Sequence, residues 1–497
     1  MSSVEMGRIT TDIPARMDRL PWARWHWLVV IGLGTVWILD GLEVTIVGSM
    51  TAALEPEGTG LGLSASDVGF AGAIYVAGAC LGALFFGQLT DRFGRKKLFL
   101  ITLGVYTVAT VLTAFSMNPT WYFACRFLTG AGIGGEYAAI NSAIDELIPA
   151  KYRGRVDIAI NGSFWVGAAG GSLLTIPLLD PTVIDQEYGW RLAFGLGAIL
   201  AVGILLVRRN VPESPRWLYI HGRDEEGDRI VKDIEEKVEH ETGKSLHGVS
   251  QTITIRQRKT IGIAMIARTV FTLYPRRTVL CLALFIGQAF LYNAFFFTYG
   301  STLIELLDVT QVGYYIALFA LSNFAGALLL GPLFDIVGRV RMIAGTYISS
   351  GVLLAIAGFM LADLTAVTLT AVGMVIFFFA SAGASAAYLT ASEVFPMETR
   401  ALCIALFYSV GTAVGGITGP LYFAKLIEDA IVSGDITDIA PGYYLGAALM
   451  VAGGIVTIFL GVRAEGQTLE NIAKPLTAED DSGEEPATKA GPQPVHS

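Results

Sequence analysis

The stretch that decides the fold is a charged turn, GQLTDRFGRKK, at residues 87–97. A second turn, GPLFDIVGRVR at residues 331–341, keeps the same order of a Gly, an acid four residues later, a Gly three residues after the acid, and then an Arg. The acids are Asp91 and Asp335, which are 244 residues apart. Both turns lie between long apolar segments. A pattern that repeats at such a distance indicates a chain built from two similar halves.

A second repeated pair supports the duplication. The sequence ELIP starts at Glu146 and is followed by Arg153, and EVFP starts at Glu393 and is followed by Arg400. The two glutamates are 247 residues apart, close to the spacing of the two aspartates. The offset therefore extends over more than one loop of each half.

Acids and arginines at a membrane edge can pair with one another and with helix ends. We therefore predict a latch that closes one end of the molecule, and we expect Asp91 to contribute more to it than Asp335. A basic turn that only fixes topology is the alternative. The predicted latch residues are Asp91, Arg92, Arg95, Glu146, Arg153, Asp335, Arg339, Glu393 and Arg400.

The composition excludes a soluble protein. Of the 497 residues, 53% are apolar and only 15% are charged, and the mean hydropathy is +0.57, whereas soluble domains contain about a quarter charged residues. The net charge of -9 comes from acids in the tail and outer loops, so no nucleic-acid partner is expected. The four cysteines lie in apolar stretches at unrelated spacings, which favours packing over disulfides or a metal site. No cofactor is expected either.

Apolar runs of about 20 residues, each able to cross about 30 Å of hydrocarbon, predict an all-α membrane protein. We expect twelve transmembrane helices in two pseudo-symmetric six-helix halves. The predicted spans are 27–50, 68–90, 97–117, 120–143, 156–178, 191–210, 278–300, 311–333, 341–361, 366–390, 401–423 and 442–463. Lys and Arg concentrate in the short loops after even-numbered spans, which predicts that both termini are cytoplasmic.

The same pattern divides the chain into five segments. They are a cytoplasmic N-terminal segment (1–26), an N-terminal half (27–210), a cytoplasmic linker (211–277), a C-terminal half (278–463) and a cytoplasmic tail (464–497). The linker carries mixed charge and is expected to form amphipathic helices on the membrane surface. The tail is acidic and poor in apolar residues, which predicts disorder.

Glycine recurs within one predicted span, at Gly130, Gly132, Gly134 and Gly135. A dinucleotide-binding loop follows a strand, whereas this run lies inside an apolar helix. Close packing of helices is the better explanation.

Five motifs together resemble the signature set of the major facilitator superfamily, in its sugar-porter-like branch. They occur in the expected order over nearly the whole chain: DRFGRK at 91–96, RFLTG at 126–130, the segment 146–155, PESPRWL at 212–218, and EVFP at 393–396 with the Arg that follows it. The resemblance implies a twelve-helix secondary transporter that works by alternating access. An enzyme is not expected, because no nucleophile–base pair or metal-ligand cluster appears.

Charged residues inside a membrane span need a reason, and the first half carries several. Asp40 and Glu43 share a helix face because they are three residues apart, and Arg126 reaches about the depth of Glu43. We predict a Glu43–Arg126 ion pair. Protonation of the acid weakens such a pair, so it can couple transport to protons; a structural ion pair is the alternative. In the resemblance, Glu43 falls where symporters carry an Asp, and Arg126 falls on their helix-four Arg.

Polar and aromatic side chains of other spans are candidates for the solute site. They are Trp165, Gln288, Tyr292, Asn293 and Tyr388. In the resemblance, Gln288 and Asn293 match two sugar-binding amides, which can otherwise be interhelical hydrogen-bond partners. Gly287, Ala168 and Tyr388 stand where its other sugar ligands are expected. An ordinary hexose is disfavoured, since each buried hydroxyl without a partner costs about 1–3 kcal/mol.

Two short motifs favour an organic acid. DGLE at 40–43 and GGEY at 134–137 resemble segments of acid:proton and metabolite:proton symporters. The predicted function is proton symport of a small carboxylated metabolite across the cell membrane, by a monomer whose partners are the solute, protons and the bilayer. The alternatives are a sugar or polyol transporter, a proton-antiport exporter of drugs or metabolites, and a solute receptor that does not transport.

Overall fold

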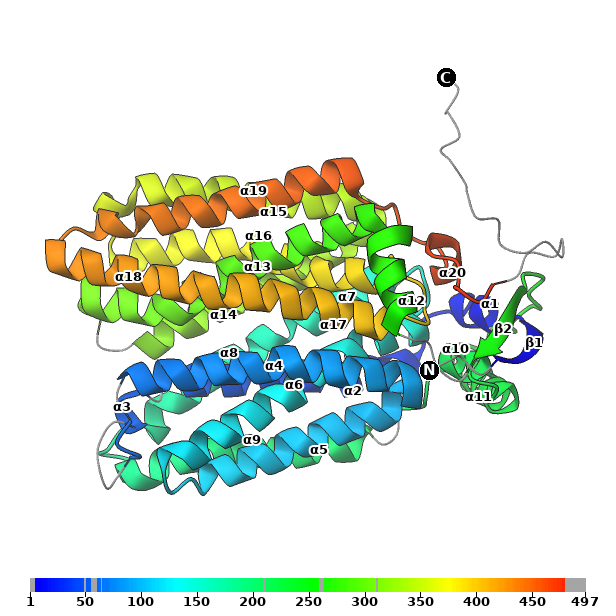
Figure 1. Ribbon diagram of the computed structural model, residues 1–497, viewed down its shortest axis with the longest axis horizontal. Coiled ribbons are helices and arrows are strands. Elements are labelled where there is room, and N and C mark those ends of the chain that lie inside the picture. Colours follow the sequence, from blue (N-terminus) through cyan, green and yellow to red (C-terminus); the bar gives the residue numbers. More distant parts are fainter. Residues whose placement is uncertain are drawn as a thin grey trace.

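The computed structural model describes residues 5–48, 51–54, 60–63, 65–208, 211–258, 263–309 and 312–478. The first half contains α2 (Arg24–Gly48), α4 (Ala65–Phe93), α5 (Arg95–Ala114), α6 (Pro119–Leu147), α7 (Arg153–Gly162), α8 (Phe164–Leu178) and α9 (Gln186–Arg208). The second half contains α13 (Pro275–Ser301), α14 (Val312–Ile336), α15 (Arg339–Phe359), α16 (Ala366–Glu393), α17 (Arg400–Gly411), α18 (Ile417–Ser433) and α19 (Ala440–Leu460). The two sets form two bundles side by side, blue to cyan and green to red in Figure 1. The predicted all-α fold of two six-helix halves is confirmed.

Two of the twelve spans are interrupted. One consists of α7 and α8, which are divided at Ser163, and the other consists of α17, a π-helical turn η4 (Thr412–Gly416) and α18. Ten segments of the described chain are long and apolar enough to cross a membrane. The two remaining spans are α7–α8 and the charged α6. These two spans supply Tyr137 and Asn161 to the cavity described below.

Shorter elements connect the spans or lie at their ends. They are α3 (Thr51–Leu54), α12 (Ile263–Arg268), η1 (Thr269–Leu273), η2 (Thr302–Leu306), η3 (Leu361–Asp363) and η5 (Ile436–Ile439).

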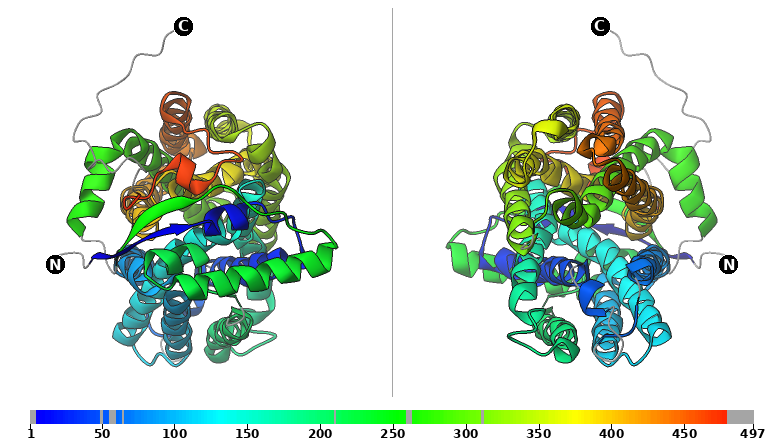
Figure 2. Two further views of the ribbon diagram at one scale, coloured as in Figure 1. Left: turned by 90° about the vertical axis from the view of Figure 1, so that its right-hand side faces the viewer. Right: turned by 90° about the vertical axis from the view of Figure 1, so that its left-hand side faces the viewer.

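One end of the two bundles, at the right of Figure 1, is covered by a group of elements that we call the cap. The cap consists of β1 (Glu5–Thr11), α1 (Ile13–Asp18), α10 (Pro215–Ile220), α11 (Asp224–Thr242), β2 (Ile253–Arg258) and α20 (Leu469–Ile472). β1 and β2 pair in antiparallel fashion, which the left view of Figure 2 shows in blue and green. Arg16 of α1 binds Asp228 at 2.6 Å and Glu235 at 2.5 Å, both on α11. The cap thus joins the N-terminal segment, the linker and the C-terminal segment.

The cap corrects two predictions from the sequence. The linker does contain an amphipathic helix, α11, which buries Val231, Ile234 and Val238, but it also contains the strand β2, which was not expected. The tail was predicted to be disordered from residue 464. Residues 464–478 instead have defined positions, because Leu469 and Ile472 of α20 are buried. Residues 479–497 lie outside the described part of the chain.

Glycines let helices of the first half touch backbone to backbone. A Cβ atom on Gly130 or Gly134 of α6 would lie 2.1 or 2.0 Å from a carbonyl oxygen of α4. A Cβ on Gly41 of α2 would lie 1.8 Å from the Phe164 carbonyl oxygen, and one on Gly167 of α8 would lie 1.7 Å from that of Ile38. No side chain fits at such distances. The glycine-rich run of α6 therefore serves helix packing, as the sequence predicts.

Gly167→Ala is expected to lower the melting temperature by roughly 1–3 °C, because the added methyl must push α8 away from α2 and overpacking costs about 1–3 kcal/mol. Gly170→Ala on the same helix is the matched control, since a Cβ there meets nothing within 4 Å. The measurement is thermal unfolding of the two purified variants. Equal melting temperatures would contradict a direct backbone contact between α2 and α8.

Candidate functional site

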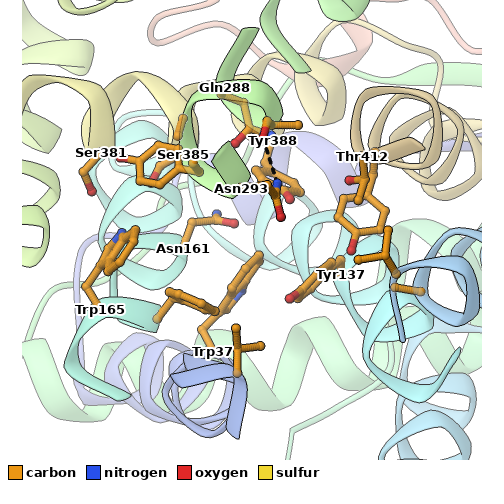
Figure 3. A pocket seen from close by; sticks show the side chains of 18 of the residues that line it. Trp37, Tyr137, Asn161, Trp165, Gln288, Asn293, Ser381, Ser385, Tyr388 and Thr412 are labelled. Atoms are coloured by element: carbon orange, nitrogen blue, oxygen red, sulfur yellow. Dashed lines mark hydrogen bonds between the residues drawn. The ribbon is translucent and has the colours of Figure 1, made fainter. Parts of the chain in front are cut away.

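A cavity lies between the two halves, with side chains from both bundles in its wall (Figure 3). Its empty space, including the mouth, is about 990 Å³. The candidate solute-binding residues all line it: Trp165, Gln288, Tyr292, Asn293 and Tyr388. The structure therefore brings together side chains from α8, α13 and α16 that the sequence could only propose separately.

Aromatic rings form much of the cavity wall. The rings of Trp37 and Tyr137 stack with centroids 4.4 Å apart and planes 6° apart, and Tyr408 meets Tyr137 edge-on at 5.0 Å. On the other side, Trp165 lies 5.4 Å from Tyr292. The free faces and edges of these rings can contact a planar or carbon-rich solute. Trp37 and Tyr408 also line the cavity and were not predicted from the sequence.

Polar atoms at the cavity come mainly from amides and hydroxyls. Asn293 donates from Nδ2 to the Ala289 carbonyl oxygen at 2.8 Å, and the Tyr292 hydroxyl donates to Asn323 Oδ1 at 3.0 Å. Asn161 of α7 also lines the cavity, whereas Ala168, which the resemblance placed at a sugar ligand, packs against Gly41 of α2. The amide that this broken span supplies is therefore Asn161. None of the described lining residues is Lys, Arg, Asp or Glu.

A buried ion pair lies behind the ring of Tyr75, a residue of the cavity wall. Arg126 Nη1 lies 2.6 Å from Glu43 Oε1, and the two side chains are only 2% and 3% exposed. The guanidinium also lies 4.6 Å from the ring centroid of Tyr75, which lines the cavity. The structure thus forms the ion pair that helix depth predicted and places it behind Tyr75.

Asp40 lies behind a different aromatic residue of the cavity wall, Tyr137. Its side chain is buried and faces Tyr137, which lines the cavity and stacks on Trp37. Asp40 and Glu43 lie one helical turn apart on α2. Asp40 faces the lining residue Tyr137, whereas Glu43 is linked to Tyr75 through Arg126.

The latch residues gather at the capped end, and their charges cross between the halves. Glu146 of α6 pairs with Arg400 of α17 at 3.3 Å and with Arg95 of α5 at 2.9 Å. Arg153 of α7 lies 4.0 Å from Glu393 of α16. Each half therefore supplies both an acid and an arginine to its counterpart.

The two aspartates of the repeated turns hold the opposite half by its backbone. Asp335 accepts hydrogen bonds from the backbone nitrogens of Gly154 at 3.1 Å and Arg155 at 3.0 Å, and from Arg155 Nε at 2.9 Å. It also pairs with Arg339 at 2.9 Å. Asp91 accepts from the backbone nitrogen of Leu402 at 3.1 Å. Asp335 thus makes more contacts across the halves than Asp91, the reverse of what the sequence suggests.

Arg92 was predicted as a latch residue, but its side chain lies outside the group of latch contacts. Its side chain is exposed, and its guanidinium lies 5.0 Å from the ring centroid of Phe93. Asp91 instead pairs with Arg95, one turn later, at 3.2 Å. In the second half, Arg339 takes the corresponding place and binds both Asp335 and Glu393.

The structure adds a third repeated feature that the sequence analysis missed. Gly94 and Gly338, which precede α5 and α15, have φ angles of 102° and 107°, where a side chain is strained. Glu213 accepts a hydrogen bond from the backbone nitrogen of Arg95 at 2.9 Å, and Glu465 accepts one from that of Arg339 at 3.3 Å. Burial raises the pKa of Glu213, although the hydrogen bonds that its carboxylate accepts favour the ionised form and offset part of this rise. Both glutamates follow the last helix of their half.

The described residues contain no group of three or more His, Cys, Asp or Glu that could hold a metal ion. The chemistry available at the site therefore consists of aromatic surface, amide and hydroxyl groups, and the two buried acids of α2 with Arg126.

Comparisons with known proteins agree on the kind of protein. The family model described as "Sugar (and other) transporter" matches residues 25–475. The niacin transporter NiaP of Acinetobacter baylyi is 29% identical over 93% of this chain and 99% of its own length. The gentisate transporter of Corynebacterium glutamicum is 31% identical over 36% of this chain and 39% of its own length.

A solved structure shows the same fold. The proton:xylose symporter XylE of the major facilitator superfamily superimposes with a TM-score of 0.74 at 16% sequence identity, covering 90% of this chain and 98% of that one. The match of the family model over most of the chain is decisive. The chain belongs to the sugar (and other) transporter family and has the fold of the major facilitator superfamily.

Proposed function

We propose that this transporter imports a small aromatic carboxylate together with a proton, by alternating access of one cavity to the two sides of the cell membrane. In this proposal both termini lie in the cytoplasm and the transporter functions as a monomer. The observation that carries the proposal is the buried Glu43–Arg126 pair, whose guanidinium packs on the ring of Tyr75, a residue of the cavity wall.

The wall of the cavity supports the substrate class. Stacked and edge-on rings of Trp37, Tyr137 and Tyr408 suit a flat ring, while Gln288 and Asn293 suit its polar substituents. The relatives named above are a niacin transporter and a gentisate transporter, and both names denote aromatic carboxylic acids. An aromatic acid therefore fits the residues of the cavity wall, and it belongs to the same chemical class as the compounds in the names of both relatives.

Coupling follows from the charges around Arg126. While Glu43 is ionised, it neutralises Arg126, and the cavity offers no other cation among its described lining residues. Protonation of Glu43 leaves the guanidinium charge uncompensated behind Tyr75. A carboxylate in the cavity then gains an attraction that it lacks otherwise, because charges interact strongly in a poorly solvated site. The proton and the anion thus favour each other's binding, and their net charge is zero.

Alternating access requires the capped end to open and close. The latch contacts of Glu146, Asp335 and Arg400 join the halves at that end, so they support a state in which the cavity is closed on the cap side. Release of the latch and rotation of the halves about the cavity would open the same site to the cap side.

Proteoliposomes containing the purified protein test the proposal. An inwardly directed proton gradient is expected to drive accumulation of radiolabelled nicotinate or benzoate, and a pH indicator inside the vesicles should report acidification when the acid is added. Empty vesicles control for passive diffusion of the protonated acids. Proton movement opposite to the solute would favour an exporter, sugar flux without acid flux would favour a sugar transporter, and saturable binding without flux would favour a receptor.

A further inference from the structure

Asn161 occupies the last turn of α7, just before the break at Ser163, and it lines the cavity. Its side chain is only 5% exposed. The side-chain nitrogen Nδ2 lies 2.9 Å from Asn141 Oδ1 and 2.8 Å from both the carbonyl oxygen and Oδ1 of Asp157. Every one of these neighbours is an oxygen.

These neighbours fix which way the amide group faces. Asn141 donates from its own Nδ2 to the Tyr137 carbonyl oxygen at 2.8 Å, so its Oδ1 is left as an acceptor for Asn161. The backbone carbonyl of Asp157 is an acceptor in any protonation state of that residue. A flipped Asn161 would set its own oxygen against these acceptors. The nitrogen must therefore face the protein, which turns Oδ1 the other way.

The oxygen of Asn161 is without a partner in the part of the chain that the structure describes. No donor among the described residues lies within hydrogen-bond distance of Oδ1, which is buried. Figure 3 shows the side chain extending into the interior of the site, in the space between Trp165 and Tyr137. A buried acceptor without a donor is unfavourable, and native structures seldom keep one without a reason.

We infer that Asn161 Oδ1 accepts a hydrogen bond from the transported solute, so that the site selects acids that also carry an O–H or N–H donor. The inference rests on the proposed function, and within the aromatic carboxylates it ranks those with a donor on the ring above those without one, such as benzoate. A carboxylate alone supplies only acceptors at neutral pH. A ring hydroxyl or a protonated ring nitrogen supplies the missing donor.

The test compares ligands that differ in one donor. Binding to the purified protein is measured by calorimetry for benzoate, the three hydroxybenzoate isomers and their methoxy counterparts, which keep the oxygen but lose the proton. At least one hydroxybenzoate is expected to bind about tenfold to a hundredfold more tightly than its methoxy partner, the usual range for leaving a buried acceptor without a donor.

Asn161→Leu should erase this preference, so that the hydroxy and methoxy acids bind with equal affinity. Asn323→Leu is the matched control. It removes another buried Asn, whose Oδ1 already accepts a hydrogen bond from Tyr292, so it should weaken all ligands alike and keep their ratio. If Asn161 has only a structural role, Asn161→Leu should likewise weaken all ligands alike and keep the ratio of hydroxy to methoxy affinity.

The outcomes separate the inference from the proposal beneath it. Equal binding of hydroxy and methoxy acids by the wild type, or a ratio that survives in Asn161→Leu, overturns the role of Asn161 and leaves aromatic-acid transport standing. Binding of none of the acids overturns the aromatic-acid proposal and this inference with it. If Asn161→Leu does not fold, Asn161→Ser and the wild-type ratio decide the question.

Discussion

Glu43→Gln is expected to abolish proton-driven accumulation of the solute and to leave solute exchange intact. The glutamine keeps the size of the side chain and an oxygen for Arg126, which now lies 2.6 Å from Glu43, but it can neither bind nor release a proton. The cavity and the movement of the halves are unchanged, so counterflow of labelled against unlabelled solute should persist. Both assays are run in vesicles with equal amounts of folded protein, at a clamped membrane potential.

The alternative of a structural ion pair gives a different result. Removal of one partner of a buried pair leaves the other charge uncompensated and costs about 3–5 kcal/mol, so folded yield would fall and both assays would fail together. Glu428→Gln, an exposed position on α18, is the matched control and should change neither assay. Uphill accumulation that survives in Glu43→Gln would refute the coupling role and direct attention to Asp40, which lies on the same helix as Glu43 and faces Tyr137 of α6.

Asp335→Asn is expected to reduce the rate of transport at least tenfold, and more than Asp91→Asn does. Both oxygens of Asp335 accept hydrogen bonds from backbone nitrogens of the opposite half, at Gly154 and Arg155. An amide replaces one of these oxygens by an NH2 group, which faces an N–H donor instead of accepting from it. Loss of one hydrogen bond to a charged group costs about 1.5–3 kcal/mol, which exceeds a factor of ten in an equilibrium.

Asp91 can keep its contact with Leu402 through the remaining oxygen, so the weaker effect is expected there. The state of the latch can be followed at Cys403, a buried cysteine near both Asp91 and Arg400. Its rate of alkylation, read by mass spectrometry, should rise in the order wild type, Asp91→Asn, Asp335→Asn. Asp363→Asn, at an exposed position in η3, should leave the rate unchanged. Wild-type flux in Asp335→Asn at normal protein levels would refute the latch.

The sequence predicts the global fold because span length, charge asymmetry and a repeat are all properties of local sequence. It also predicts the Glu43–Arg126 pair, since the depth of a residue in a membrane can be counted from the ends of its helix. The contribution of Tyr75 depends on which face of α4 turns toward Arg126. That rotation is set by packing of α4 on α6, and no pattern in the sequence reports it.

Other features escape prediction because their partners are far apart in the chain. β1 has no strand-like neighbour until β2, and Glu465 looks like an ordinary tail residue until it is seen at the start of α15. Asn161 is inconspicuous for a different reason. Its importance comes from the three acceptors around its nitrogen, and these lie on two different helices.

The pairing of β1 with β2 also orders events in time during synthesis. Residues 5–11 leave the ribosome before their partner, residues 253–258, which follows about 240 residues later, a delay of roughly 12–50 s at about 5–20 residues per second. The first half is complete by then, and Ala478, which bridges to Ile255, comes later still. The cap is therefore assembled in sequence, and its completion marks a chain whose second half has already been made.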